Sequence, residues 1–210
     1  GFVTTADGVV ARRVAERVAA ARARIAAAAM RAGRDPASVT LLAVTKTAGA
    51  AQIVAALASG VTDFGENRVA DAEARIHDVA ALLTGGDAPA ARPCWDLIGH
   101  LQSKKERRAV GLFDRVDTIP SVPSVLVEVN SARDAARSGF TPESAAAAAG
   151  AVFALPHLRV DGLMGIAPLT RDVDERRGAF AMLRTLRRAV SERYPTQPLP
   201  TLSMGMSDDF

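Results

Sequence analysis

Apolar side chains recur along this chain at two spacings, one typical of helices and one typical of buried strands. In residues 9–33 they return every three or four positions, which predicts an amphipathic helix that ends at Gly33. Residues 39–45 form a short, nearly continuous apolar run with β-branched side chains, which predicts a strand buried on both faces. Further strands are predicted at residues 61–64, 95–99, 115–119, 125–129, 158–166 and 201–204, most of them separated by helices.

This order of elements predicts an α/β protein. Strands that alternate with helices form parallel sheets, and 210 residues suffice for one barrel of the (β/α)8 type, so we expect a single barrel domain over residues 1–210. Two features depart from a complete barrel. The segment between Ile119 and Val125 is shorter than the dozen or so residues that a crossover between parallel strands needs. The expected barrel therefore lacks one crossover helix, and it also lacks an eighth strand after residues 201–204.

Lys46 is the first candidate for chemistry. It directly follows the predicted strand 39–45, at the strand end where α/β barrels carry their active sites. An ammonium group is costly to bury without a partner, so a lysine at this position is unusual. Such a lysine can form a Schiff base with a carbonyl compound such as pyridoxal phosphate. The alternative is a lysine that only extends into solvent at the rim of the sheet, and the strand taken alone favours this alternative.

Small and polar residues follow other predicted strands as well. In a barrel these strand ends meet at one mouth, and small residues there let a flat ligand approach the backbone. Ser207 is predicted to cap a helix whose first N–H groups would bind a phosphate, with ordinary capping as the alternative. The segments concerned are residues 46–47, 65–67, 99–102, 162–165 and 203–207.

Five motifs occur in order at these strand ends, in residues 41–47, 64–69, 97–102, 162–164 with 166–168, and 202–207. Together they resemble the pyridoxal phosphate homeostasis protein family, which is related to the N-terminal barrel of bacterial alanine racemase. The resemblance implies a protein that holds pyridoxal 5'-phosphate (PLP) as an internal aldimine on Lys46. It implies a role in intracellular PLP homeostasis and delivery without turnover, with PLP-dependent apo-enzymes as partners. The residues expected to bind PLP are Val44, Lys46, Asn67, His100, Met164, Ser203, Met204, Gly205 and Ser207.

Three features depart from the family pattern. Asp96 stands where the family usually has His, and Lys104 stands where it usually has Asn. The family's Arg-Ile-Gly segment, which completes contacts to the phosphate and the pyridine nitrogen, does not occur in these residues. We expect Asp96 at the mouth of the barrel or beneath it, where an inward-facing carboxylate would weaken phosphate binding. Residues 1–210 are therefore expected to bind PLP weakly.

A PLP-dependent racemase or lyase that uses Lys46 as a base is the main alternative. Racemisation needs two bases, one on each face of the substrate Cα, and the lysine supplies only one. The single tyrosine, Tyr194, precedes the strand 201–204, so we expect it at the bottom of the barrel, away from the mouth. A binding protein without turnover is therefore favoured.

Charge and composition limit which other functions the chain could have. A net charge of +3 does not by itself indicate nucleic-acid binding. The basic run 104–108 lacks interleaved aromatic residues and is predicted to be a solvated helix face, with RNA or protein binding through it as a second alternative. The single Cys94 excludes an internal disulfide and a cysteine-cluster metal site, and no apolar stretch reaches the roughly 18 residues of a membrane span. We expect a cytoplasmic protein with no metal, nucleic-acid or membrane partner.

Overall fold

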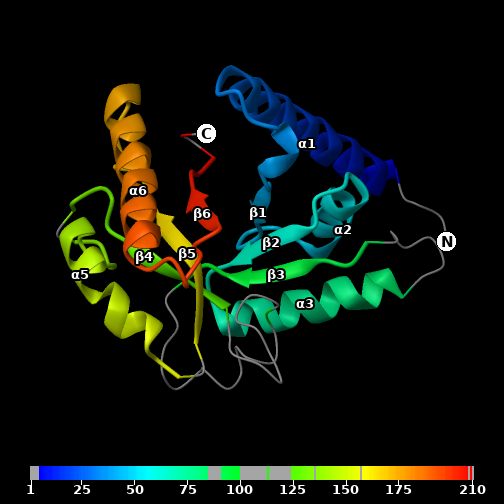
Figure 1. Cartoon of the computed structure of the whole chain (residues 1–210). Helices are drawn as coiled ribbons and strands as arrows, with labels where there is room; N and C mark the ends of the chain where they lie inside the picture. Colours follow the sequence, from blue (N-terminus) through cyan, green and yellow to red (C-terminus); the bar gives the residue numbers. More distant parts are fainter. Residues whose placement is uncertain are drawn as a thin grey trace. The chain divides into compact units, whose positions relative to one another are not determined.

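The computed structural model describes residues 5–84, 91–99, 113, 124–134, 136–156, 158–207 and 209. The chain divides into two compact units, Gly1–Thr118 (unit 1) and Ile119–Phe210 (unit 2). The described part of each unit contains one three-stranded parallel sheet with helices between its strands (Figure 1). The prediction of an α/β protein with parallel strands is confirmed. The closed single barrel over residues 1–210 stays a prediction.

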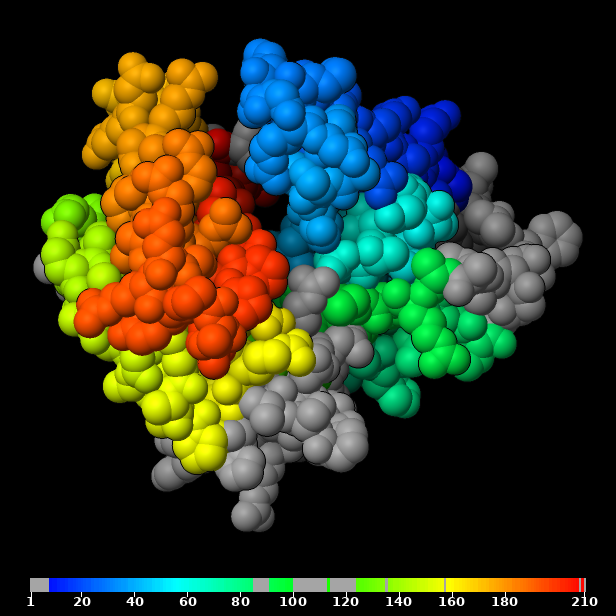
Figure 2. Space-filling view, viewed as in Figure 1, coloured from blue at the N-terminus to red at the C-terminus, as the bar shows by residue number. Residues whose placement is uncertain are grey.

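Unit 1 follows the alternation expected from its sequence. Its sheet has the order β1-β2-β3, and both strand pairs are parallel. Most of helix α1 lies at the surface, as the blue atoms of Figure 2 show. The elements are α1 (Thr5–Arg31), the short 3-10 helix η1 (Pro36–Ser38), β1 (Leu42–Val44), α2 (Ala50–Ala58), β2 (Asp63–Glu66), α3 (Val69–Leu83) and β3 (Cys94–Leu97).

The core of unit 1 forms where α2 and α3 cover the sheet. Phe64 of β2 is fully buried, and its ring centroid lies 5.5 Å from that of Trp95 in β3. Ile53 and Leu57 of α2 belong to the same cluster. Burying such side chains contributes about 1.5–3 kcal/mol each, so the apolar stripes of α2 and α3 hold these helices on the sheet.

Arg22 joins α1 to the end of α2. Its Nη1 and Nη2 donate to the carbonyl oxygens of Ser59 and Gly60 at 3.0 and 2.6 Å. These carbonyls lie just after the last turn of α2, where backbone acceptors lack partners within the helix and a cation is favoured. Gly60 has a φ of +84°, a conformation that glycine adopts without strain.

Unit 2 repeats the pattern with longer elements. Its sheet has the order β4-β5-β6, again parallel, and α5 and α6 pack against it and against each other (Figure 1). Its core includes Val129, Leu163 and Leu183. The elements are β4 (Ser124–Val129), α5 (Pro142–Phe153), β5 (Arg159–Gly165), α6 (Val173–Arg193) and β6 (Thr201–Met204).

Some predicted boundaries shift. The strand predicted over residues 39–45 contracts to β1, and η1 precedes it. Asp35 caps η1 by accepting from the Ala37 N–H, and the Val39 N–H donates back to the Pro36 carbonyl. The strand predicted at 115–119 and the basic run 104–108 lie outside the described residues. None of the helices described here is both long and apolar enough to cross a membrane.

Replacing Arg22 with Ala should lower the free energy of unfolding by about 1 kcal/mol, because two carbonyls at the end of α2 lose their charged donor. Urea denaturation of the chain followed by circular dichroism measures this change. Arg17→Ala, at an exposed position of the same helix, is the control and should change stability by less than about 0.5 kcal/mol. Equal effects of the two substitutions would contradict the role assigned to Arg22.

Candidate functional site

The carboxyl edge of the sheet in unit 1 carries three of the predicted site residues. Val44 ends β1 and is 49% exposed. Lys46 follows two residues later with an exposed side chain, and Asn67, also exposed, comes directly after β2. Because β1 and β2 run parallel, with Val44 opposite Gly65, these residues lie at the same edge. The structure thus brings Val44, Lys46 and Asn67 together.

A buried carboxylate lies beneath this edge. Glu66, the last residue of β2, has no exposed surface. The Thr45 hydroxyl donates to its Oε1 at 2.5 Å, and Nη1 of Arg75 in α3 lies 2.8 and 2.7 Å from its two oxygens. A buried charge is tolerated only when it is paired and hydrogen-bonded, and Glu66 meets both conditions.

Arg75 also binds the loop that carries Lys46. Its Nη2 donates to the Lys46 carbonyl at 3.2 Å, and its Nε donates to the Ala48 carbonyl at 3.0 Å. The Ala48 N–H in turn donates to the Thr45 carbonyl at 2.8 Å, which closes a tight turn around Lys46. The lysine backbone is fixed on both sides while its side chain extends into solvent.

The loops after β2 and β3 touch at Gly99. A Cβ atom on this residue would overlap the backbone carbonyl of Asn67, so only glycine permits the observed approach. Asn67 is therefore held close to the loop that leads to His100. The predicted site residue His100 itself lies outside the described residues.

Asp96 lies lower than the candidate residues. It is the third residue of β3, opposite Gly65, and only 7% of its surface is exposed. Asp96 was expected either at the edge of the sheet or beneath it. The structure places it beneath the edge, where it is buried. Lys104, the other departure from the family pattern, lies outside the described residues.

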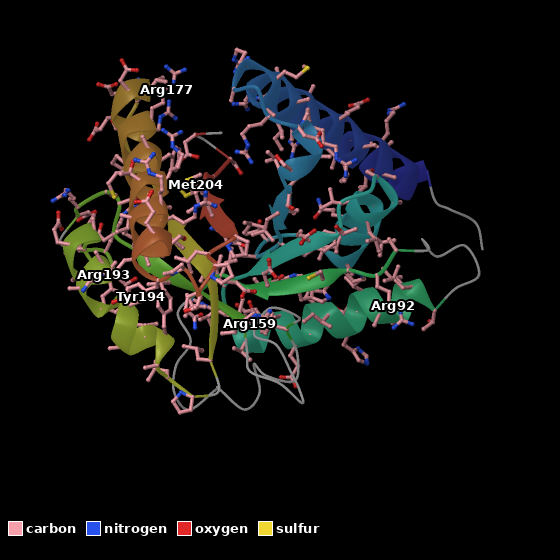
Figure 3. All side chains as sticks on the ribbon, viewed as in Figure 1. Arg92, Arg159, Arg177, Arg193, Tyr194 and Met204 are labelled. Carbon is pink, nitrogen blue, oxygen red and sulfur yellow. The ribbon has the colours of Figure 1, made fainter. Side chains whose placement is uncertain are left out.

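The carboxyl edge of the sheet in unit 2 carries the remaining predicted residues. Met164 of β5 and Ser203 of β6 are partners in the parallel register, and both are half-buried. Met204 ends β6 and is 42% exposed (Figure 3). Gly205 then turns the chain with a φ of +90° and leads to the exposed Ser207. Met164, Ser203 and the segment 204–207 thus share one edge.

The segment after Gly205 is held by hydrogen bonds between Met206 and Asp209. The Asp209 N–H donates to the Met206 carbonyl at 3.2 Å. The Met206 N–H donates to the Asp209 carboxylate at 2.5 Å. A carboxylate thus occupies a backbone N–H group within the segment 203–207, which was expected to bind phosphate. The described residues show no capping hydrogen bond from Ser207, whose role in a helix cap stays a prediction.

Tyr194 takes part in packing at the other end of unit 2. It follows the last residue of α6, and Figure 3 shows it at the end of this helix, away from Met204. Its ring meets Phe153 edge-on with 5.3 Å between centroids, and its hydroxyl lies against Gly150 of α5. Tyr194 precedes β6 and lies away from the carboxyl edge of the sheet.

No metal centre emerges from the part of the chain that the structure describes. Within it, no three His, Cys, Asp or Glu side chains form a group that could hold a metal ion. The network of Thr45, Glu66 and Arg75 was not anticipated from the sequence. Its signal was a glutamate at the end of a buried strand with an arginine nine positions later on the following helix.

Comparisons with known proteins identify the family. Residues 16–210 match the family described as alanine racemase, N-terminal domain. A pyridoxal phosphate homeostasis protein of Pseudomonas aeruginosa is 38% identical over 213 residues, covering 94% of this chain and 86% of the relative. The chain belongs to the pyridoxal phosphate homeostasis protein family. The protein of the same name from Escherichia coli K12 is 36% identical over 221 residues, covering 94% of this chain and 88% of the relative.

Solved structures agree with membership of the homeostasis protein family. A protein of Bifidobacterium adolescentis described as unknown matches with a TM-score of 0.84 and 31% identity, covering 99% of this chain and 90% of that chain. PipY of Synechococcus elongatus, solved with PLP bound, matches with a TM-score of 0.72 and 31% identity. The match covers 93% of this chain and 90% of the PipY chain. Alanine racemase of Corynebacterium glutamicum, at 15% identity and a TM-score of 0.55, shows a shared fold alone. The chain therefore has the fold of the alanine racemase N-terminal barrel family.

Gly99→Ala should destabilise this homeostasis-family chain by about 1–3 kcal/mol, because the added methyl group forces the Asn67 backbone to move. Thermal or urea denaturation measures the loss. Gly8→Ala in α1 is the matched control, since nothing lies within 4 Å of its added Cβ and alanine favours a helix. A Gly99→Ala variant as stable as the Gly8→Ala variant would show that the loops after β2 and β3 separate easily.

Proposed function

We propose that this chain binds PLP through Lys46 and stores or delivers it without catalysing a reaction. One observation carries the proposal: Lys46 lies at the carboxyl edge of the sheet in a turn closed by the Ala48 N–H and the Thr45 carbonyl, and Arg75 holds its carbonyl. Membership of the homeostasis protein family supports it, as does the PLP-bound structure of PipY.

The donor chemistry at the edge in unit 1 fits this cofactor. PLP, when bound, supplies an aldehyde that condenses with a primary amine. The sequence has three lysines, Lys46, Lys104 and Lys105, and Lys46 alone follows a predicted buried strand. Val44 and Asn67 would flank the pyridine ring with an exposed apolar side chain and an exposed amide. Lys46 thus provides the point of attachment.

The edge in unit 2 offers groups suited to the phosphate. Ser203 and Ser207 provide hydroxyl donors, and Gly205 leaves its backbone uncovered by a side chain. A phosphate that used the Met206 N–H would have to displace the Asp209 carboxylate. Met164 and Met204 keep their assignment as cofactor-binding residues by resemblance. His100 keeps its assignment as a polar lining residue by resemblance.

Turnover would need a second base, and the described residues favour a binding role. The single tyrosine, Tyr194, packs on Phe153 and Gly150, beyond the amino end of β6. The relatives bear a name that denotes homeostasis, whereas the likeness to alanine racemase extends to the fold alone. We propose PLP-dependent apo-enzymes as recipients of the cofactor. A complete (β/α)8 barrel and a cytoplasmic location are the further parts of this proposal.

Lys46→Ala should abolish the PLP adduct that borohydride fixes to the protein, because the amine that attacks the aldehyde is removed. Peptide mapping by mass spectrometry locates the adduct in the wild-type chain and in the variant. The Lys104→Ala/Lys105→Ala double variant is the control and should keep the adduct on Lys46. Undiminished labelling of the Lys46→Ala variant would assign the cofactor to another amine.

The rival function of a racemase is tested by incubating the PLP-loaded protein with single L-amino acids. Chiral chromatography should detect no D-enantiomer above the level produced by free PLP, because racemisation needs a base on each face of the substrate Cα and the single tyrosine of the sequence packs on Phe153. Multiple turnovers per protein molecule, lost in the Lys46→Ala variant, would establish an enzyme instead.

A further inference from the structure

The guanidinium group of Arg75 links a helix, a strand and the Lys46 loop in unit 1. Each of its three nitrogens has an acceptor: Nε has the Ala48 carbonyl, Nη1 the Glu66 carboxylate and Nη2 the Lys46 carbonyl. The Arg75 side chain is only 17% exposed. A planar fork of donors can meet these three acceptors at once, whereas the point charge of a lysine cannot.

Glu66 fixes the orientation of this fork. Its carboxylate is completely buried and accepts from both Arg75 and the Thr45 hydroxyl. The Thr45 N–H also donates to the Gly65 carbonyl at 3.0 Å, and the Thr45 hydroxyl oxygen lies 3.2 Å from the same carbonyl. Thr45 is therefore held by β2, and Ala48 is held by α3 through Arg75. The turn between them has little freedom to move.

This arrangement matters for the amine of Lys46. The lysine side chain is long and flexible, so the region that its amine explores depends on where the Cα atom is held. Anchoring the carbonyl of the same residue removes the backbone part of that freedom, and such pre-organisation raises the effective concentration of a reacting group.

We propose that Arg75, held in place by Glu66, is a positioning residue that sets the reactivity of the Lys46 amine toward an aldehyde. The proposal rests on the proposed function of Lys46. Arg75 acts through the carbonyls of Lys46 and Ala48, and the amine itself forms the bond to the cofactor. A purely structural role would stabilise unit 1 without selecting among the lysines of the chain.

The three lysines allow these roles to be separated within one sample. Pyridoxal and PLP are each added to the folded chain, adducts are fixed with borohydride, and the ratio of Lys46 adduct to Lys104 plus Lys105 adduct is measured by mass spectrometry. Arg75→Lys keeps a positive charge for Glu66 but cannot reach both carbonyls. We expect it to lower the Lys46 ratio about tenfold with either aldehyde, because a small displacement of a reacting group has a large effect on rate.

Arg22→Lys is the matched control. Arg22 also donates from its two terminal nitrogens to two backbone carbonyls of unit 1, but those carbonyls belong to Ser59 and Gly60. This variant should lower the melting temperature without changing the adduct ratio. An Arg75→Lys variant that stays folded and keeps the wild-type ratio would overturn the proposal. A wild-type chain that shows no preference for Lys46 would instead overturn the proposed function.

Thr45→Val provides a second variant with nearly the same shape. It removes the hydroxyl that binds Glu66 and leaves Arg75 intact, so the fork loses part of its support. We expect a drop in the Lys46 ratio that is smaller than that of Arg75→Lys, with Thr45→Ser restoring the wild-type value. If Arg75→Lys fails to fold, the two Thr45 variants test the proposal. Equal Lys46 adduct ratios in Thr45→Val and Thr45→Ser would refute the positioning role.

Discussion

Much of unit 1 depends on how a carboxylate is accommodated at the end of a buried strand. Glu66 is fully enclosed, and an unpartnered charge there would destabilise the fold by several kcal/mol. Arg75 supplies the opposite charge and Thr45 supplies a hydroxyl, so the strand β2, the helix α3 and the loop after β1 share one set of hydrogen bonds. Removing one partner of such a pair typically costs about 3–5 kcal/mol, more than most apolar contacts in the same core. The Arg75 side chain that neutralises Glu66 thus also holds the Lys46 loop.

Parallel pairing explains why the candidate residues gather at strand ends. Side chains within β2 are buried throughout, whereas Lys46 after β1 and Asn67 after β2 are exposed. In unit 2 the same rule leaves Met204 and Ser207 accessible after β6 while Leu163 and Val160 fill the core. The fold therefore places most residues that provide stability within the strands and most residues available to a ligand after the strand ends.

The sequence predicted elements with strong local signals and missed features that depend on tertiary contacts. The helix predicted over residues 9–33 matches most of α1, because its apolar side chains recur every three or four positions. Lys46 was found because an ammonium group after a buried strand is rare. The partnership of Glu66 with Arg75 escaped notice, since neither spacing nor composition shows which helix face turns toward a strand end. The hydrogen bond between the Met206 N–H and the Asp209 carboxylate was not predicted, because the pattern of the sequence does not show which acceptor an N–H group meets.

The Asp209 carboxylate affects how strongly this segment could bind an anion. An anion entering at the Met206 N–H gains one hydrogen bond and releases another, so the net gain is smaller than for a vacant donor. When the anion leaves, the Asp209 carboxylate can accept from the Met206 N–H again. Under the proposed function, the phosphate and the Asp209 carboxylate would compete for this N–H group, and phosphate would gain less there than at a vacant donor.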